Sequence, residues 1–225
     1  MSKSVPANAV YVYELPVRAW HWINALCVVV LSVTGWLIAS PLSSTSGEAS
    51  ANFLMGYVRF FHFAAGYVLA IGLLVRVYWA LVGNEYAREL FYLPVWRGDW
   101  WAGVIHELRW YLFMEKQPAK YLGHNPVART FMFLILLPST VVMIVTGFAL
   151  YGEGTQASSW SNDMFTSWVM PLFGSSQAVH SWHHLVFWAI VTFVILHVYA
   201  AVREELVSKQ SMIGTIKDGY RVFRD

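Results

Sequence analysis

The sequence predicts an all-α membrane protein, a four-helix transmembrane bundle, from its composition and from the length of its apolar stretches. Of the 225 residues, 57% are hydrophobic and only 12% are charged, whereas a soluble domain carries about 25% charged residues. Four apolar stretches are long enough to cross the roughly 30 Å hydrocarbon core of a bilayer as helices. We therefore expect one integral-membrane domain over residues 1–225, with spans at about 17–39, 55–82, 127–151 and 179–202.

The cysteine content excludes several kinds of cofactor site, and the N-terminal stretch bears on whether a signal peptide is present. The chain has a single cysteine, Cys27, so it can form neither an internal disulfide nor a Cys-x-x-Cys-His attachment for c-type haem, nor a cysteine-bound metal cluster. We expect no cleavable signal peptide, because the first apolar stretch is long and lacks a small-residue cleavage site. The first span should therefore stay in the membrane as an anchor.

Local signals mark the first two spans. Pro16 suits the first position of a helix, because its missing N–H would have no partner there, and the first span ends before Pro41. Tryptophans on both sides of His21 are typical of a membrane interface. Span two carries His62 near its start and Arg76 near its end. Both spans thus place ionisable side chains near a membrane surface.

A long loop, residues 83–126, joins spans two and three. Its segment 100–111 mixes aromatic and charged residues, as an amphipathic helix in the membrane interface does. Span three contains Pro138 and no histidine, and a segment without Lys or Arg, residues 152–178, leads to span four. We therefore expect an amphipathic interfacial segment in the loop between spans two and three.

Basic residues predict the orientation in the membrane. Fourteen of the fifteen Lys and Arg residues lie near the termini or in the 76–129 region, and only Arg59 falls on the other side. Four spans place both termini on one side of the membrane. The positive-inside rule assigns that side, and the loop between spans two and three, to the cytoplasm.

Span four is bracketed by histidines, His180, His183 and His184 at one end and His197 at the other. Ionisable residues inside an apolar helix are costly and usually functional. His183 and His197 are fourteen residues apart, which puts them within roughly 40° of one helix face and about 21 Å apart along the axis. His180 and His184 do not share that face.

The predicted orientation of the four spans places each of these two histidines at the same membrane depth as a histidine of another span. His21 should lie level with His197 at the cytoplasmic side, and His62 should lie level with His183 at the opposite side. Each depth then offers two imidazoles from different helices, which is what bis-histidine ligation of a haem iron requires. We therefore predict that the bundle binds two haems through His21, His62, His183 and His197.

Other residues in the spans have a functional and a structural interpretation. We call the haem at the cytoplasmic depth the inner haem and the other the outer haem. Arg76, fourteen residues after His62, could pair with the propionates of the inner haem, or extend toward the interface as Arg59 could. Gly35, fourteen residues after His21, could let the outer haem approach the backbone, or serve helix packing.

The two remaining histidines of span four have no assigned role. His180 and His184 could hydrogen-bond lipid headgroups, a haem propionate or a partner protein.

The residues before span three form a candidate quinone site. Two axial imidazoles leave the iron no open position, which favours electron transfer, and a lipid-soluble quinone is a natural terminal acceptor. Asn125 could hydrogen-bond a quinone carbonyl, and His124 could relay protons because it titrates near neutral pH. Alternatively, Asn125 only caps a helix that begins at Pro126. Glu107 and His106 are weaker candidates for the proton relay.

Taken together, these residues resemble the b-type cytochrome subunit of membrane-bound nickel–iron hydrogenases. The similarity extends nearly end to end. Its motifs are Pro16-Val17-Arg18-Ala19-Trp20-His21-Trp22, Met55-Gly56-Tyr57-Val58-Arg59-Phe60-Phe61-His62, Arg76-Val77-Tyr78-Trp79-Ala80, Arg88-Glu89-Leu90-Phe91, Gly123-His124-Asn125-Pro126, His180-Ser181-Trp182-His183 and His197-Val198-Tyr199.

The resemblance implies a membrane anchor and electron-transfer subunit that is not catalytic for hydrogen on its own. Two b haems, on the four histidines already selected, would carry electrons from the iron–sulfur small subunit of a periplasmic hydrogenase to the quinone pool of the bacterial inner membrane. The hydrogenase large subunit, lipids and quinone would be its partners, and no nucleic acid is expected. Related formate dehydrogenase subunits place a quinone beside an asparagine before the third span, which matches Asn125.

Rival functions stay open from the sequence alone. The cytochrome subunit of a formate dehydrogenase, or another b561-like quinone reductase, would use the same chemistry. A haem-free transporter or a structural anchor would instead use the histidines to line a proton path. For partner docking we expect the aromatic segment 160–174, which carries no Lys or Arg, and the loop around Glu48.

Overall fold

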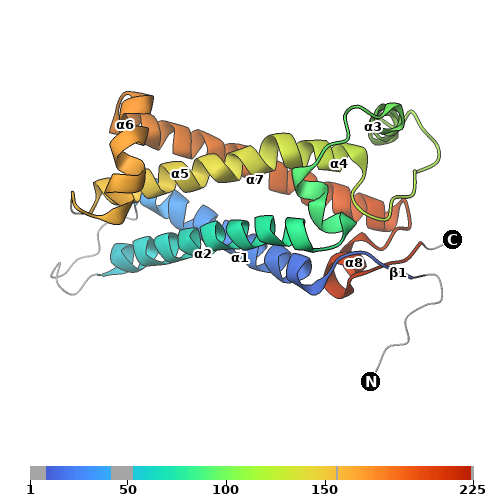
Figure 1. Cartoon of the computed structure of the whole chain (residues 1–225), viewed down its shortest axis with the longest axis horizontal. Coiled ribbons are helices and arrows are strands. Elements are labelled where there is room, and N and C mark those ends of the chain that lie inside the picture. The colour runs from blue at the N-terminus through green and yellow to red at the C-terminus, as the bar shows by residue number, and fades with distance from the viewer. Residues whose placement is uncertain (1–8, 42–52, 156, 224–225) are drawn as a thin grey trace, which may run out of the picture. The chain divides into compact units, whose positions relative to one another are not determined.

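The computed structural model describes residues 9–41, 53–155 and 157–223 (Figure 1). Four of the described helical stretches are long and apolar enough to cross a membrane: α1 (Leu15–Ala39), α2 (Leu54–Val82), the stretch Pro126–Glu153 and α7 (Ser176–Leu206). Each predicted span lies within one of these stretches. The predicted class, an all-α membrane protein with four spanning helices, is therefore confirmed, although the loop around Glu48 lies outside the described residues.

The chain divides into two compact units. Unit 1 comprises Met1–His21, Arg76–Pro138 and Thr192–Asp225, and unit 2 comprises Trp22–Val75 and Ser139–Val191. Each of the two predicted histidine pairs falls within one unit. His21 and His197 belong to unit 1, and His62 and His183 belong to unit 2.

Unit 1 contains the long loop, which folds into the 3₁₀ helix η2 (Glu85–Phe91) and the α-helix α3 (Gly98–Tyr111). Trp100, Glu107 and Trp110 are the buried residues of α3, so this helix is amphipathic as predicted. The end of α7 holds it in place. Arg203 donates a hydrogen bond to the Trp110 carbonyl at 2.9 Å, and the Trp110 indole donates one to Glu204 at 3.0 Å.

The described residues near both ends of the chain form regular structure in unit 1. Strand β1 (Val10–Tyr11) pairs antiparallel with β2 (Tyr220–Arg221), which follows the short helix α8 (Met212–Asp218). Figure 1 shows β1 beside α8. Arg221 is only 1% exposed and donates to the Leu122 and Gly123 carbonyls. The C-terminal segment therefore holds the loop that leads into the third spanning stretch.

The third spanning stretch changes its helical winding once. It consists of α4 (Pro126–Phe131), the π-helical turn η3 (Met132–Leu136) and α5 (Leu137–Glu153). Pro138 lacks an N–H and its ring collides with the carbonyl of the fourth preceding residue in regular α-helix. A wider turn directly before Pro138 relieves this conflict, as π-turns inside helices do.

Unit 2 also contains a short helix outside the four spans, at the predicted docking segment. The π-helical turn η4 (Asn162–Thr166) runs into α6 (Ser167–Phe173). Val169 of α6 is fully buried against Ala149 and Val179. The α6 helix is thereby fixed to the ends of α5 and α7.

Candidate functional site

His62 and His183 line one cavity within unit 2. The cavity measures about 410 Å³, which lies in the range of pockets that hold cofactors. Its walls are largely aliphatic and aromatic. Helices α1, α2, α5 and α7 all contribute to them, and the lining includes Leu31, Gly35, Leu69, Met143, Gly147, Phe187 and Ile190.

A threonine fixes the orientation of His62. The Thr34 hydroxyl lies 2.9 Å from His62 Nδ1 and donates its own hydrogen to the Val30 carbonyl at 2.6 Å. Since the hydroxyl hydrogen is used there, the hydroxyl oxygen is the acceptor and Nδ1 carries the proton. The other ring nitrogen, Nε2, is therefore the one with a free lone pair.

His183 is held in the same way from another helix. The Thr146 hydroxyl lies 2.7 Å from His183 Nδ1 and donates to the Val142 carbonyl at 2.6 Å. Thr146 is 1% exposed, so this hydrogen bond is shielded from water. His183 Nε2, like its counterpart on His62, is left as a donor of electrons to a metal.

Two glycines leave room for these imidazole rings. A Cβ atom on Gly35 would lie 3.2 Å from His62 Cε1, and one on Gly147 would lie 3.3 Å from His183 Cε1. These separations are shorter than ordinary carbon–carbon contacts of about 3.5–4.0 Å. Any larger residue would push the ring that the adjacent threonine orients.

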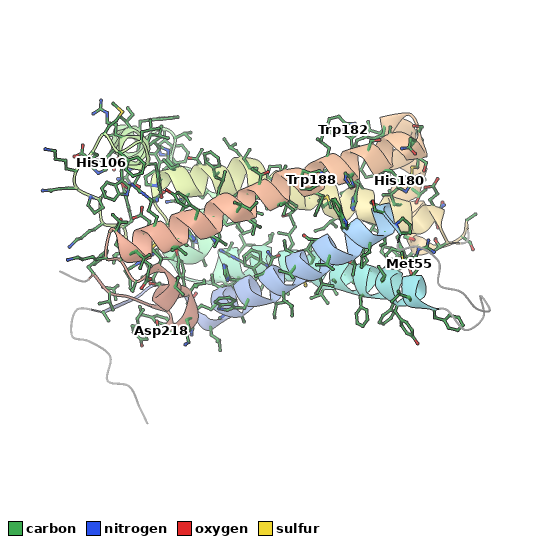
Figure 2. All side chains as sticks on the ribbon, turned by 180° about the vertical axis from the view of Figure 1, so that it is seen from behind. Met55, His106, His180, Trp182, Trp188 and Asp218 are labelled. Atoms are coloured by element: carbon green, nitrogen blue, oxygen red, sulfur yellow. The ribbon has the colours of Figure 1, made fainter. Side chains whose placement is uncertain are left out.

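His180 and His184 lie at the edge of the same cavity. Both contribute to its lining, together with Arg59, and both are exposed side chains. His180 Nδ1 donates to the Ser176 carbonyl at 3.0 Å. Figure 2 shows His180 projecting from α7 on a different side from Trp182.

In unit 1, His21 and His197 face each other. Their ring centroids are 6.3 Å apart. His197 also stacks on Phe193, with centroids 5.8 Å apart and planes inclined by 13°. This stacking supports the plane of one imidazole from α7 itself.

A buried arginine lies in the same unit as this pair. Arg76 is 4% exposed, and its Cζ lies 5.5 Å from the Trp20 ring centroid and 5.4 Å from that of Phe91. Arg76 Nε and Nη1 and Trp20 Nε1 have no hydrogen-bond partner among the described residues. Buried charged donors normally have partners, so this cluster fits an anionic group such as a propionate.

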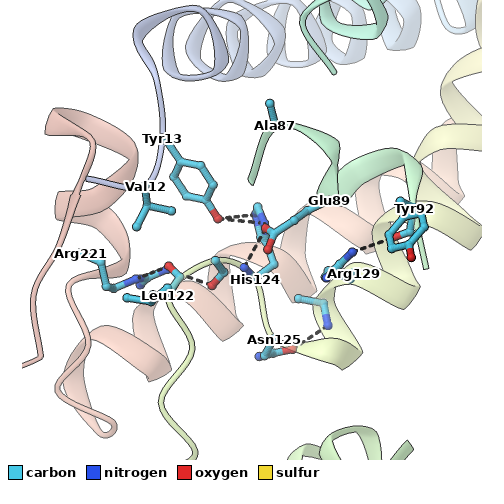
Figure 3. Close-up of polar contacts among 12 residues, drawn as sticks. Val12, Tyr13, Ala87, Glu89, Tyr92, Leu122, His124, Asn125, Arg129 and Arg221 are labelled. Atoms are coloured by element: carbon cyan, nitrogen blue, oxygen red, sulfur yellow. Dashed lines mark hydrogen bonds and ion pairs between the residues drawn. The ribbon is translucent and has the colours of Figure 1, made fainter. Parts of the chain in front are cut away.

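The segment before span three forms a compact polar cluster in unit 1 (Figure 3). His124 Nδ1 lies 2.8 Å from the Glu89 carboxylate and 2.9 Å from the Tyr13 hydroxyl. Because a carboxylate only accepts, Nδ1 carries the proton, and Nε2, 3.5 Å from the Tyr13 hydroxyl, is the nitrogen that can accept one. Burial, with Glu89 nearby, raises the pKa of Tyr13 well above its usual value. A Cβ on Gly123 would collide with the Glu89 carboxylate.

Asn125 is the N-cap of α4. Its Oδ1 accepts from the Ala128 N–H at 2.7 Å, and its Nδ2 donates to the Tyr111 hydroxyl at 3.0 Å. Asn125 is 5% exposed. The capping interpretation therefore describes what Asn125 does in this structure, whereas its contact with a quinone stays a prediction.

Glu107 is another buried carboxyl of this region. It is 2% exposed, and burial, with the Glu204 carboxylate adding to it, raises its pKa to about 7. Burial and Glu107 together raise the pKa of Tyr121 to about 12. His106, on the same helix, has a buried Nε2 without a hydrogen-bond partner among the described residues.

Sequence reasoning missed five of these residues. Thr34 and Thr146 had a detectable signal, because Val-Thr-Gly occurs at residues 33–35 and again at 145–147. Tyr13 and Arg221 had none, and Glu89 was named only within the motif Arg88-Glu89-Leu90-Phe91. They reach residues 122–124 from positions 35 to 111 residues away in the chain.

Comparisons with known proteins give the family. Residues 12–215 match the family described as prokaryotic cytochrome b561. The probable Ni/Fe-hydrogenase B-type cytochrome subunit of Azotobacter vinelandii is 59% identical, over 97% of this chain and 90% of the relative. Its namesake from Cupriavidus necator is 58% identical, over 97% and 89%. The probable Ni/Fe-hydrogenase 1 B-type cytochrome subunit of Escherichia coli K12 is 51% identical, over 94% and 90%. The chain belongs to the prokaryotic cytochrome b561 family, among the Ni/Fe-hydrogenase B-type cytochrome subunits.

Proposed function

We propose that this chain is the membrane anchor and electron-transfer subunit of a nickel–iron hydrogenase, and that it delivers electrons to the membrane quinone pool through two b haems. The observation that carries the proposal is the presence of one histidine pair in each unit. The names of the relatives support the hydrogenase partner. Membership of a b-type cytochrome family supports haem b as the cofactor.

The residues of each unit fit a haem in their own way. In unit 2, His62 and His183 would be the axial ligands, because both present an unprotonated Nε2 beside an apolar cavity. In unit 1, His21 and His197 would be the ligands, and Arg76 with Trp20 would bind a propionate. Haem b bound in this way supplies one-electron chemistry without an open coordination position.

For quinone, we propose the cluster around His124. Glu89 orients the imidazole so that Nε2 can exchange a proton, and Tyr13 stays protonated beside it. Reduction of a quinone takes up protons as well as electrons, so an imidazole, which can both accept and donate a proton, suits this position. Asn125 would contribute by holding the start of α4 or by contacting the quinone directly.

For the partner and the orientation, we propose docking at the exposed side of η4 and α6. Met164, Trp168 and Leu172 are 62%, 47% and 69% exposed and follow one another at four-residue steps along one helical stripe. This stripe would face the iron–sulfur small subunit, with the large subunit beyond it, on the periplasmic side of the inner membrane. Both termini would then lie in the cytoplasm.

Metal analysis of the intact complex tests this function. We expect that affinity purification through this chain yields nickel and iron together with haem b, and that the complex reduces a quinone with hydrogen. Molybdenum or tungsten in place of nickel would assign the chain to a formate dehydrogenase. A reduced-minus-oxidised spectrum without a haem α-band would instead support a transporter or a structural anchor.

A further inference from the structure

The Val-Thr-Gly sequence of α1 and its repeat in α5 perform the same task on two histidines. Thr34 contacts His62 of α2, and Thr146 contacts His183 of α7. In each case the glycine that follows the threonine faces Cε1 of the same imidazole. A Cβ atom at that glycine would lie 3.2 Å from Cε1 of His62 and 3.3 Å from Cε1 of His183. The two arrangements match atom for atom, although they come from different pairs of helices.

The hydrogen bonds of the two threonines leave one tautomer. Each hydroxyl donates to the carbonyl four residues earlier in its own helix, at 2.6 Å in both cases. Each hydroxyl oxygen can then only accept from the imidazole Nδ1–H. Both threonines are buried, at 9% and 1% exposed, so their hydroxyls have little access to water.

We infer that the threonine–glycine pairs Thr34–Gly35 and Thr146–Gly147 are positioning residues that fix the tautomer and ring plane of His62 and His183 and lower the reduction potential of the haem bound there. The inference rests on the proposed function, because it takes these two histidines as axial ligands. A hydrogen bond at the far nitrogen makes an imidazole a stronger electron donor to its metal. Stronger donation favours the oxidised iron, which lowers the potential.

Replacement of both threonines by valine tests the inference. Valine keeps the shape and removes the acceptor. We expect the purified chain to keep its haem content, and the potential of one haem to rise in a redox titration followed at the α-band. At an ambient potential near that midpoint, the ratio of reduced to oxidised haem should increase by about three- to tenfold for each of the two hydrogen bonds removed, the size of one net hydrogen bond. Threonine to serine at both positions should restore the original ratio.

Thr130 provides a matched control. It lies in α4 and donates to the Pro126 carbonyl at 2.8 Å, so Thr130→Val removes the same intrahelical bond without a histidine partner. We expect it to leave both potentials unchanged. An equal shift in this control, or unchanged potentials in the double valine variant, would overturn the inference.

Two further outcomes are distinguishable. If the double valine variant loses one haem, recovery of that haem by the serine variants supports the positioning role, and failure to recover it contradicts that role. His183→Ala tests the underlying assignment separately. If His183→Ala leaves the haem content unchanged, then the proposed haem site fails, and the inference fails with it.

Discussion

In unit 2, each histidine of the pair donates a hydrogen bond to a threonine of a neighbouring helix, inside an apolar cavity. In unit 1, His197 instead stacks on Phe193, and the guanidinium of Arg76 is buried in the same unit without a full set of partners. The first pair is therefore oriented by neutral hydrogen bonds, and the second shares its unit with a buried positive charge.

This difference has a consequence for electron flow. A hydrogen bond at the distal nitrogen stabilises an oxidised iron, whereas a buried positive charge stabilises the additional electron of a reduced one. We therefore expect the unit 2 site to have the lower potential and the unit 1 site the higher. Electrons entering from the periplasmic side would then move downhill toward the quinone.

The largest expected effect is steric and confined to unit 2. Gly147→Val should abolish haem binding at His183, because even a single Cβ would lie 3.3 Å from the imidazole Cε1. Haem content should fall by about half in a pyridine haemochrome assay, while the unit 1 haem keeps its potential. Gly56→Ala is the control, since a Cβ there meets nothing within 4 Å. Full haem content in Gly147→Val would contradict the cavity assignment.

Removing the positive charge of Arg76 in unit 1 should have the next largest effect. Arg76→Gln should lower the potential of the unit 1 haem, so that the ratio of reduced to oxidised haem falls by about tenfold at a fixed ambient potential, the size of about 1.4 kcal/mol of electrostatic stabilisation. Arg76→Lys should preserve most of the potential. A shift that appears instead in the haem removed by His183→Ala would show that Arg76 acts on the other site.

Two variants of Asn125 distinguish its role as a helix cap from a role in contacting the quinone. Asn125→Ala should destabilise the protein by about 1 kcal/mol, because the cap to the Ala128 N–H is lost, and thermal unfolding in detergent measures this. Asn125→Ser keeps a capping hydroxyl but loses the amide donor. Slow quinone reduction in both variants, with intact haem spectra, supports the quinone contact. Normal kinetics in Asn125→Ser would restrict Asn125 to its structural role.

The last prediction concerns pH and the loop of unit 1. Burial raises the pKa of Glu107 from 4.5 to about 7 in the folded protein, so the folded state binds the proton more tightly than the unfolded state. Stability should therefore be highest below about pH 4.5, fall as pH rises toward 7, and level off above it. Glu107→Gln should flatten this part of the unfolding profile. A profile unchanged by the substitution would exclude Glu107 as its cause.

Much of the framework was accessible from the sequence. Apolar length gave the four spans, and His183 and His197 both belong to α7, as the fourth predicted span requires. The amphipathic pattern of residues 100–111 gave α3. These features depend on local periodicity, which a single sequence displays directly.

The polar contacts were less accessible, for physical reasons that differ between the units. Thr34 and Thr146 were detectable as a repeated Val-Thr-Gly, because an identical local task was solved twice. Tyr13 meets His124 across 111 residues of chain, and no periodicity connects them. Such contacts form only when residues near the two ends of the chain fold against the loop. The sequence near these ends therefore did not predict them.

The haem content of the purified chain tests the central claim most directly. We expect two haems per chain in the wild type, one in His183→Ala and two in His184→Ala, whose side chain is exposed and lacks the threonine contact of His183. The haem that remains in His183→Ala should be the one with the higher potential. A wild-type content of one haem, or a loss caused by His184→Ala and not by His183→Ala, would contradict the assignment of one haem to each histidine pair.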